Sequence, residues 1–177
     1  ANELGGDVLD PGATQLHAWP VEVQPPTRQN IGMAKAADGA IWVANYEGRL
    51  LRYDPATQAT TLVAQLPAFI KAMHIDRNGR IWIATVQGVF EIDQPGAQPQ
   101  PVSVAQMPRS ACSDIDEAVD GTLWFACDAG VLRLAKGNWS LLRASGVAAS
   151  TQFTSIAAET DGSLWLGMSQ AGLRHAQ

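Results

Sequence analysis

The sequence predicts an all-β protein built from a repeated unit, and three observations support this class. A motif with a central tryptophan occurs four times. Its tryptophans, Trp42, Trp82, Trp124 and Trp165, are 40, 42 and 41 residues apart. Helical periodicity is almost absent, whereas Gly and Pro, which mark turns, number 16 and 10. A repeat of about 41 residues that holds about four short strands is typical of a β-propeller. We therefore expect about four blades of four antiparallel strands.

Composition and charge limit the function classes. The chain has 177 residues, of which 46% are apolar and 16% charged, a balance typical of a folded protein. Its net charge of -5 and its isoelectric point of about 5.0 argue against nucleic-acid binding, which needs clustered Lys and Arg. No apolar run is long enough to span a bilayer, so we expect no direct membrane insertion by this segment.

The repeated motif predicts a hairpin in each unit. It reads Asp38-Gly-Ala-Ile-Trp-Val-Ala, Asn78-Gly-Arg-Ile-Trp-Ile-Ala, Asp120-Gly-Thr-Leu-Trp-Phe-Ala and Asp161-Gly-Ser-Leu-Trp-Leu-Gly. Asp-Gly and Asn-Gly are preferred in two-residue type I′ turns, because both central residues need a positive φ. The apolar residues around each tryptophan do not alternate with polar ones, so both faces of that strand should be covered. We expect antiparallel hairpins with mostly buried tryptophans; a solenoid of hairpins is the alternative.

The ends of the chain predict how the blades are divided. Asp10-Pro-Gly-Ala-Thr-Gln resembles Asp54-Pro-Ala-Thr-Gln, which follows the third strand of the first complete blade. Residues 1–27 therefore form a partial blade whose fourth, outermost strand covers Leu16 to Val23. Blades should start near residues 28, 68, 110 and 152 of a single 1–177 repeat domain. The last of them stops within its third strand.

The missing outer strand of the last blade is thus present at the start of the chain. We expect the strand around Leu16 to Val23 to complete the blade that contains Trp165. It does so within one chain, giving a four-bladed ring, or between two chains, giving an eight-bladed dimeric ring. Crowding at the axis of a four-bladed ring favours the homodimer. A fragment of a larger propeller would show the same strand order.

These residues carry a family resemblance. The phrase Asp161-Gly-Ser-Leu-Trp-Leu-Gly-Met-Ser-Gln-Ala-Gly-Leu-Arg resembles the two-component regulator propeller repeat, and the resemblance covers roughly Ile31 to Gln177. It implies an extracytoplasmic or periplasmic sensor domain of a membrane signalling protein, with a histidine kinase or diguanylate cyclase elsewhere in the full-length protein. It implies no enzyme activity for this chain and a small polar or saccharide ligand. The motif is a scaffold motif and identifies architecture better than ligand.

Two other function classes remain open. The stretch from Arg49 to Thr57 is slightly similar to streptogramin lyase-like propellers, which would make the chain an enzyme. A protein-assembly module is the third class. His17, His74 and His175 form no recurrent pair with acidic residues that would indicate a metal cage, so we expect neither metal nor cofactor.

The candidate binding surface follows from propeller geometry. Propellers bind ligands at the face where the first strand of each blade begins and the second ends, and basic and amide groups there suit a polar or anionic molecule. The candidate residues at this face are Arg28, Asn30, Asn45, Tyr46, Lys71, Thr85, Arg109, Ser110, Asp128, Gln152 and Ser169. A solvated loop rim without a ligand is the alternative.

The two cysteines flank one hairpin. With a two-residue turn at Asp120-Gly121, Cys127 faces position 114 and Cys112 faces position 129. The cysteines are then diagonal neighbours on one face, at the limit of what a disulfide tolerates. A bulge or a twist at the strand start would bring them within reach, and the compartment that the resemblance implies would oxidise them. The alternative is two reduced, buried small residues.

His74 and Asp116 each lie four residues before the turn residue of their hairpin. They therefore occupy equivalent positions on the inner strands of adjacent blades. We expect structural roles for both, with a hydrogen bond from blade to blade, rather than a catalytic role.

Overall fold

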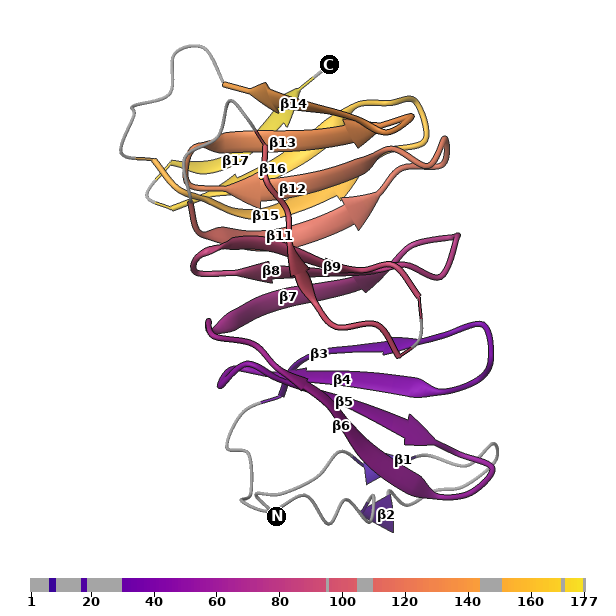
Figure 1. Cartoon of the computed structure of the whole chain (residues 1–177). Helices are drawn as coiled ribbons and strands as arrows, with labels where there is room; N and C mark the ends of the chain where they lie inside the picture. Colours follow the sequence, from indigo (N-terminus) through magenta and orange to yellow (C-terminus); the bar gives the residue numbers. More distant parts are fainter. Residues whose placement is uncertain are drawn as a thin grey trace.

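Antiparallel sheets stack face to face from one end of the chain to the other in the computed structural model (Figure 1). The structure describes residues 7–8, 17–18, 30–94, 96–104, 110–143, 151–169 and 171–176. In this part of the chain, three sheets have four strands and one has three, with the strands of each in sequence order from the innermost to the outermost. We call these sheets blades one to four. The architecture is that of a partial β-propeller, as the sequence predicts.

The strand bounds follow the repeat. Blade one holds β3 (Asn30–Lys35), β4 (Ile41–Asn45), β5 (Arg49–Asp54) and β6 (Ala59–Gln65). Blade two holds β7 (Ile70–Ile75), β8 (Ile81–Thr85), β9 (Gly88–Ile92) and β10 (Gln100–Pro101). Blade three holds β11 (Cys112–Glu117), β12 (Leu123–Cys127), β13 (Gly130–Ala135) and β14 (Asn138–Leu142). Blade four holds β15 (Phe153–Ala158), β16 (Leu164–Met168) and β17 (Gly172–Ala176).

The hairpins lie where the motif predicts them, but the predicted turn type is wrong. In blade three, the Gly121 N–H donates to the Ala118 carbonyl and the Ala118 N–H donates to the Thr122 carbonyl, so the loop has three residues. Gly121 has φ of 85°, whereas Asp120 is not among the residues with positive φ. This is a type I turn followed by a glycine bulge, and it recurs in all four blades. The Asp accepts the backbone N–H two residues later, as Asp120 does from Thr122 at 2.8 Å.

Each motif tryptophan packs on the blade that follows it. Trp42 and Trp82 are 2% and 1% exposed, because the apolar faces of blades two and three cover them. Trp124 is only half-buried, and Trp165 is 38% exposed. The expectation of four mostly buried tryptophans is therefore wrong for the last blade. Leu164 and Leu166, but not Trp165, belong to the cluster shared with blade three, and no later blade covers Trp165 in the described residues.

Carboxylates on β11 bridge neighbouring blades. The Ile156 N–H donates to Asp114 Oδ2 at 2.9 Å, and the Ala158 N–H donates to Asp116 Oδ2 at 2.7 Å. These bonds link the inner strands of blades three and four, so Asp114 and Asp116 both have a structural role. His74 Nε2 lies 3.1 Å from Oε2 of Glu117. The predicted pairing of His74 with Asp116 is wrong, because Asp116 is directed at blade four and Glu117 at blade two.

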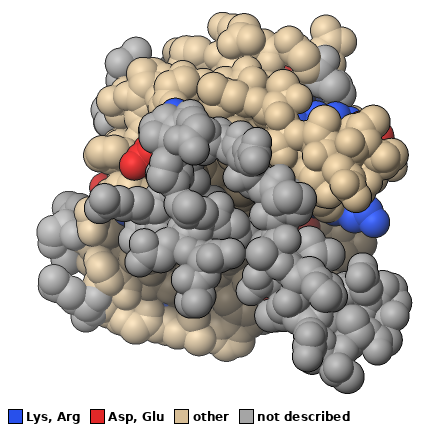
Figure 2. Space-filling view, turned by 90° about the horizontal axis from the view of Figure 1, so that it is seen from below, with Lys and Arg blue, Asp and Glu red and all other residues tan. Residues whose placement is uncertain are grey.

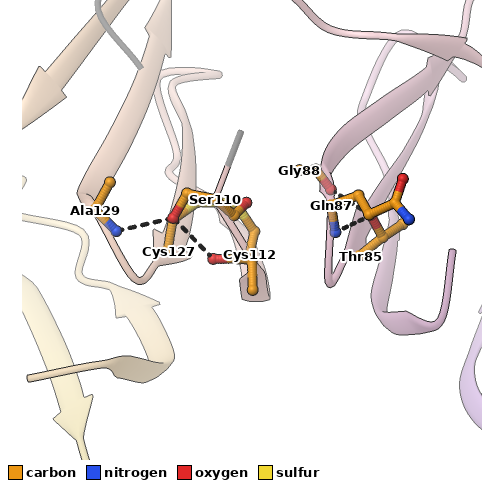
Figure 3. Close-up of a disulfide and its surroundings, with 8 residues drawn as sticks. Thr85, Gln87, Gly88, Ser110, Cys112, Cys127 and Ala129 are labelled. Atoms are coloured by element: carbon orange, nitrogen blue, oxygen red, sulfur yellow. Dashed lines mark hydrogen bonds between the residues drawn. A yellow bond between two sulfur atoms is a disulfide. The ribbon is translucent and has the colours of Figure 1, made fainter. Parts of the chain in front are cut away.

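The cysteines form the disulfide, one of the two alternatives that the sequence left open, in a register different from the predicted one. Cys112 and Cys127 pair directly across β11 and β12, with Cα atoms 3.9 Å apart and the sulfur atoms bonded (Figure 3). The predicted diagonal placement is wrong for two reasons. The three-residue turn shifts the pairing by one position, so that Asp114 faces Ala126, and a bulge at residue 113 shifts it again. The expected bulge is thus what brings the thiols together.

The N-terminal strand does not complete blade four in this structure. β2 (His17–Ala18) pairs with β1 (Asp7–Val8), and the sheet of blade four has three strands. The rest of the predicted strand, residues 16 and 19–23, lies outside the described residues. Blade one and blade four lie at opposite ends of the stack (Figure 1), so the predicted four-bladed ring is not formed by this chain. The chain is instead an open stack.

Candidate functional site

The predicted binding face is formed by the ends of second strands and the starts of first strands. Arg28 and Arg109 lie outside the described residues, and for Asn30 only the backbone is described, paired with Asn45. The structure gives the other predicted residues three different environments: turns, contacts between blades, and solvent.

Asn45 and Thr85 belong to turns and are fully buried. Asn45 Oδ1 accepts the Arg49 N–H at 2.7 Å, which stabilises the loop between β4 and β5. Thr85 Oγ1 donates to the Gly88 carbonyl and accepts the Gln87 N–H, which does the same between β8 and β9 (Figure 3). Neither side chain points its polar atoms to solvent, so these two residues shape the face rather than offer contacts.

Two pairs of residues at this face connect neighbouring blades. Tyr46 of blade one stacks on Phe69 at the start of blade two, with ring centroids 4.7 Å apart and planes at 9°. Between blades three and four, Gln152 Nε2 donates to Asp128 Oδ2 at 3.2 Å. Within blade four, the Gln152 N–H donates to Ser169 Oγ at 3.2 Å. The structure thus brings Asp128, Gln152 and Ser169 together, as a hydrogen-bonded group near solvent.

Lys71 and Ser110 complete the face. Lys71 is exposed on β7. Ser110 Oγ accepts the Ala129 N–H at 3.0 Å and so closes the loop after β12, beside the disulfide (Figure 3). An ammonium group, a carboxylate and an amide therefore share one face, and such groups can hydrogen-bond a polar or anionic ligand.

Grooves lie at the opposite end of the blades, which the sequence reasoning missed. One of these grooves has a volume of about 590 Å³ and lies between the turns of blades two and three. It is lined by Asp76, Arg77, Asn78, Arg80, Trp82, Glu91, Asp120, Gly121, Leu123, Leu134, Lys136, Gly137 and Trp139. Burial raises the pKa of Glu91, while the backbone N–H of Thr122 lowers the pKa of Asp120. Asn78 and Asp120 of the repeated motif line this groove, but the motif predicts only their turns, because the groove forms where turns of two different repeats meet.

Trp139 packs inward from the outer strand β14. Its ring lies 5.8 Å from that of Trp82 and 5.4 Å from that of Phe125. Trp82 also donates its indole N–H to Asp76 Oδ2 at 3.0 Å. Trp139 therefore covers the motif tryptophan of the preceding blade, which is a packing role.

The described residues hold no group of three or more His, Cys, Asp or Glu side chains that could bind a metal ion. The histidines whose side chains are described have other partners. His74 contacts Glu117, and His175 Nε2 lies 2.9 Å from Ser163 Oγ. Nor does the described part of the chain contain a helix long and apolar enough to cross a membrane.

Comparison with known proteins agrees with this architecture. Residues 65–87 match the family described as two component regulator propeller. This segment runs from the end of β6 through β8 and holds the second copy of the tryptophan motif. The chain carries the two component regulator propeller repeat. The regulator propeller repeat predicted from the motif is thus confirmed.

Solved structures with the same fold include larger propellers. An extracellular domain assigned to a hybrid two component system of B. thetaiotaomicron has a TM-score of 0.77 and 17% identity. The alignment covers 99% of this chain and 25% of that one. PorZ, a surface component of the type-IX secretion system of Porphyromonas gingivalis, has a TM-score of 0.76 and 18% identity, over 99% and 29% of the two chains. This chain thus spans about a quarter of the length of these two structures.

A third neighbour is an enzyme. Virginiamycin B lyase from Staphylococcus aureus has a TM-score of 0.66 and 16% identity, over 83% of this chain and 55% of the lyase. At these identities the three structures show the fold of the regulator propeller chain and not its activity. No curated protein matches the sequence.

Proposed function

We propose that this chain is part of an extracytoplasmic sensory propeller in a membrane signal-transduction protein. The observation that carries the proposal is the regulator propeller repeat at residues 65–87, together with the alignment of 99% of the chain on an extracellular two component system domain. The disulfide between Cys112 and Cys127 supports the compartment, because disulfides persist in oxidising environments.

The ligand site proposed for this sensor is the face that carries Lys71, Asp128 and Gln152. These side chains come from three blades; Lys71 lies near the start of β7, and Asp128 and Gln152 lie on loops, where sequence can vary without cost to the fold. Their ammonium, carboxylate and amide groups suit a small polar molecule such as a mono- or oligosaccharide, neutral or acidic. Few charged side chains of described residues are visible from the blade-one end (Figure 2), which gives no support to a nucleic-acid partner at that end.

A thermal-shift screen of the 177-residue chain against neutral and acidic saccharides tests the proposal. At least one sugar should raise the melting temperature, and Lys71→Ala or Gln152→Ala should abolish the shift. Lys136→Ala is the matched control, since Lys136 is also exposed but lies at the opposite end of the blades. A shift that survives both face variants would place the ligand elsewhere. The absence of a shift across the panel would contradict ligand sensing by this chain.

The lyase class is tested separately. Its support is the fold shared with virginiamycin B lyase. Incubation of the chain with a cyclic streptogramin B, followed by mass spectrometry, detects ring opening directly. Turnover above the rate without protein would favour the enzyme, and its absence would leave sensing or protein assembly.

A further inference from the structure

The outer side of blade four holds a groove that corresponds to a missing strand. It has a volume of about 560 Å³ and lies between blades three and four. Its lining residues are Trp124, Val131, Arg133, Leu142, Arg143, Gly162, Leu164, Leu166, Arg174, His175 and Ala176. β17 forms one border of the groove and is the outermost strand of its sheet.

Blade three shows what fills this space in a complete blade. Its fourth strand, β14, pairs with β13 and places Trp139 and Leu141 against blade two. There Trp139 contacts Trp82, which is 1% exposed. Trp124 occupies the same repeat position as Trp82 and is half-buried, and the described part of blade four holds three strands with none in the place of β14. The groove is therefore the site of a strand that would pair with β17 and cover Trp124.

The N-terminal segment has the sequence of such a strand. Asp10-Pro-Gly-Ala-Thr-Gln aligns with Asp54-Pro-Ala-Thr-Gln, which leads from β5 into the fourth strand β6. In blade three, Leu141 pairs with Leu132, and in blade one Leu62 pairs with Leu51. Trp19 aligns with Leu141 and Leu62, and Arg174 aligns with Leu132. The repeat thus predicts Trp19 opposite Arg174 on the face that points to blade three, His17 in the place of Trp139, and Ala18 opposite His175.

Charge complementarity favours the same occupant. The groove is lined by Arg133, Arg143 and Arg174 and by no carboxylate. Residues 1–23 contain four carboxylates, Glu3, Asp7, Asp10 and Glu22, and no Lys or Arg. An acidic, extended segment with one aromatic residue suits this groove in backbone pairing, shape and charge.

We propose that the N-terminal strand of a second copy of this chain occupies the groove, and that two copies exchange these strands reciprocally. Donation within one chain is disfavoured because β2 and β17 lie at opposite ends of the stack (Figure 1). The exchange requires release of the pairing between β1 and β2. That pairing is two residues long, and so short a ladder has little stability of its own.

Strand exchange also covers the exposed apolar side chains at both ends. Since β3 follows the donated segment directly, the partner's blade one would come to lie beside blade four. Met33 and Leu62 are 67% and 48% exposed on blade one, and Trp165 and Leu173 are 38% and 67% exposed on blade four. Each pair lies on the face that points away from the neighbouring blade of its own chain. The two faces would pack as consecutive blades do elsewhere in the stack.

Light scattering on the 177-residue chain is the first test. The wild-type chain should be a dimer whose population rises with concentration, and Trp19→Asp should shift it to a monomer. A wild-type monomer at every concentration, or a dimer unchanged by Trp19→Asp, would overturn the proposal.

A peptide of residues 9–24 keeps the test informative if Trp19→Asp affects folding. The wild-type peptide, labelled with a fluorophore, should bind saturably to the chain that carries Trp19→Asp. A second labelled peptide that itself carries Trp19→Asp should not bind this chain. Arg143→Glu in the chain should weaken binding about tenfold, and Lys136→Glu, at a turn outside the groove, should not. Equal binding of both peptides would overturn the proposal.

Cysteine trapping separates exchange between copies from closure within one. Ala18→Cys and His175→Cys are introduced into separate chains, which are mixed, unfolded, refolded together and oxidised. A crosslink between the two chains supports exchange, because directly opposite strand residues lie within disulfide reach. In a chain that carries both substitutions, a crosslink formed within the monomer would show closure on itself and refute the second copy as donor. Strand donation needs no ligand, so these outcomes are independent of the saccharide screen.

Discussion

Trp82 and Trp165 hold the same place in the repeat but lie in different environments. Each donates its indole N–H to an acid six residues earlier, Asp76 at 3.0 Å and Glu159 at 3.1 Å. Their polar contacts are therefore matched. Trp82 is buried against blade three and Trp165 is 38% exposed, so the difference between them isolates packing between blades.

This comparison gives the first prediction. Trp82→Ala should lower the free energy of unfolding by about 3–5 kcal/mol, the usual cost of removing a buried aromatic side chain. Trp165→Ala should cost about 1 kcal/mol or less. Urea unfolding of both variants, at a concentration where the chain is monomeric, measures the difference. Equal losses would mean that the motif tryptophan stabilises its own blade and not the contact with the next.

Asp114 gives a second prediction, because its burial and its hydrogen bond oppose each other. Burial raises the pKa of this carboxyl above its ordinary value of 3.8, despite the N–H of Ile156 that the carboxylate accepts. The folded state therefore holds its proton more tightly than the unfolded state. Stability from this group is greatest below the ordinary value and falls as the pH rises through the raised pKa.

Asp114→Asn removes the buried charge and its amide oxygen can still accept from Ile156, but its amide nitrogen replaces the oxygen that accepts the Ile115 N–H at 2.9 Å, so at neutral pH its stability should lie between those of the wild type and Asp114→Ala. Relative to the wild type, the Asn variant should lose stability as the pH falls towards 3.8. Asp114→Ala should lose about 1–3 kcal/mol, because the N–H of Ile156 is left without its acceptor. Thermal unfolding of the three proteins across this pH range is the measurement. An Asn variant as unstable as the Ala variant would contradict this account.

At the scale of the element, the hairpin of β11 and β12 depends on both its turn and its disulfide. The three-residue turn sets the register, the bulge at residue 113 changes it, and the two cysteines become directly opposed. Both sulfurs are buried in the cluster that joins blades two and three. The crosslink is therefore part of the core and not an exposed clasp.

Removal of the disulfide is the third prediction. The cysteines are 15 residues apart, and for a loop of that size the chain-entropy model assigns about 3 kcal/mol. Cys112→Ala with Cys127→Ala should lower the free energy of unfolding by about that amount in oxidised samples. Under reducing conditions the wild type should approach the variant. Thiol titration of unfolded, unreduced protein from an extracytoplasmic compartment should find no free cysteine; two free thiols would contradict the assigned compartment.

At the scale of the whole molecule, polar contacts hold the stack together near its inner strands. Glu117 of blade three accepts from the backbone N–H of Arg77 at 3.1 Å and contacts His74 at 3.1 Å. Arg77 also donates to the carbonyls of Val119 and Ala118, at 2.8 and 2.7 Å. This set of contacts joins blades two and three, as Asp114 and Asp116 join blades three and four.

The fourth prediction concerns this contact set. Glu117→Ala should lower the free energy of unfolding by about 1–3 kcal/mol, because His74 and Arg77 lose a shared acceptor that is only 11% exposed. Glu47→Ala is the matched control on an exposed turn and should change stability by roughly 0.5 kcal/mol at most. Saccharide binding, if present, should survive Glu117→Ala. Loss of binding at unchanged stability would move Glu117 from a structural to a binding role.

The sequence by itself determined the repeat, the strand order within each blade and the position of each hairpin. These features depend on residues close together in the chain, such as the Asp-Gly pair and the apolar strand after it. The cysteines were correctly assigned to one hairpin, and a bulge or a twist was the condition for their bond. The repeat motif is likewise local, and residues 65–87 match the two component regulator propeller.

Only the tertiary structure decided which side chains meet across blades. Glu117 rather than Asp116 contacts His74, since the register on β11 depends on a turn type and a bulge that the Asp-Gly pair does not specify. Asn45 and Thr85 turned inward to cap their loops, where Asn45 Oδ1 accepts the Arg49 N–H and Thr85 Oγ1 donates to the Gly88 carbonyl, while Asn45 Nδ2 is buried without a hydrogen-bond partner among the described residues. The exposure of Trp165 and the groove beside Trp124 arise because a blade is buried only when the next one covers it. Contacts between repeats are set by the stacking of distant segments, and identical local motifs therefore end in different environments.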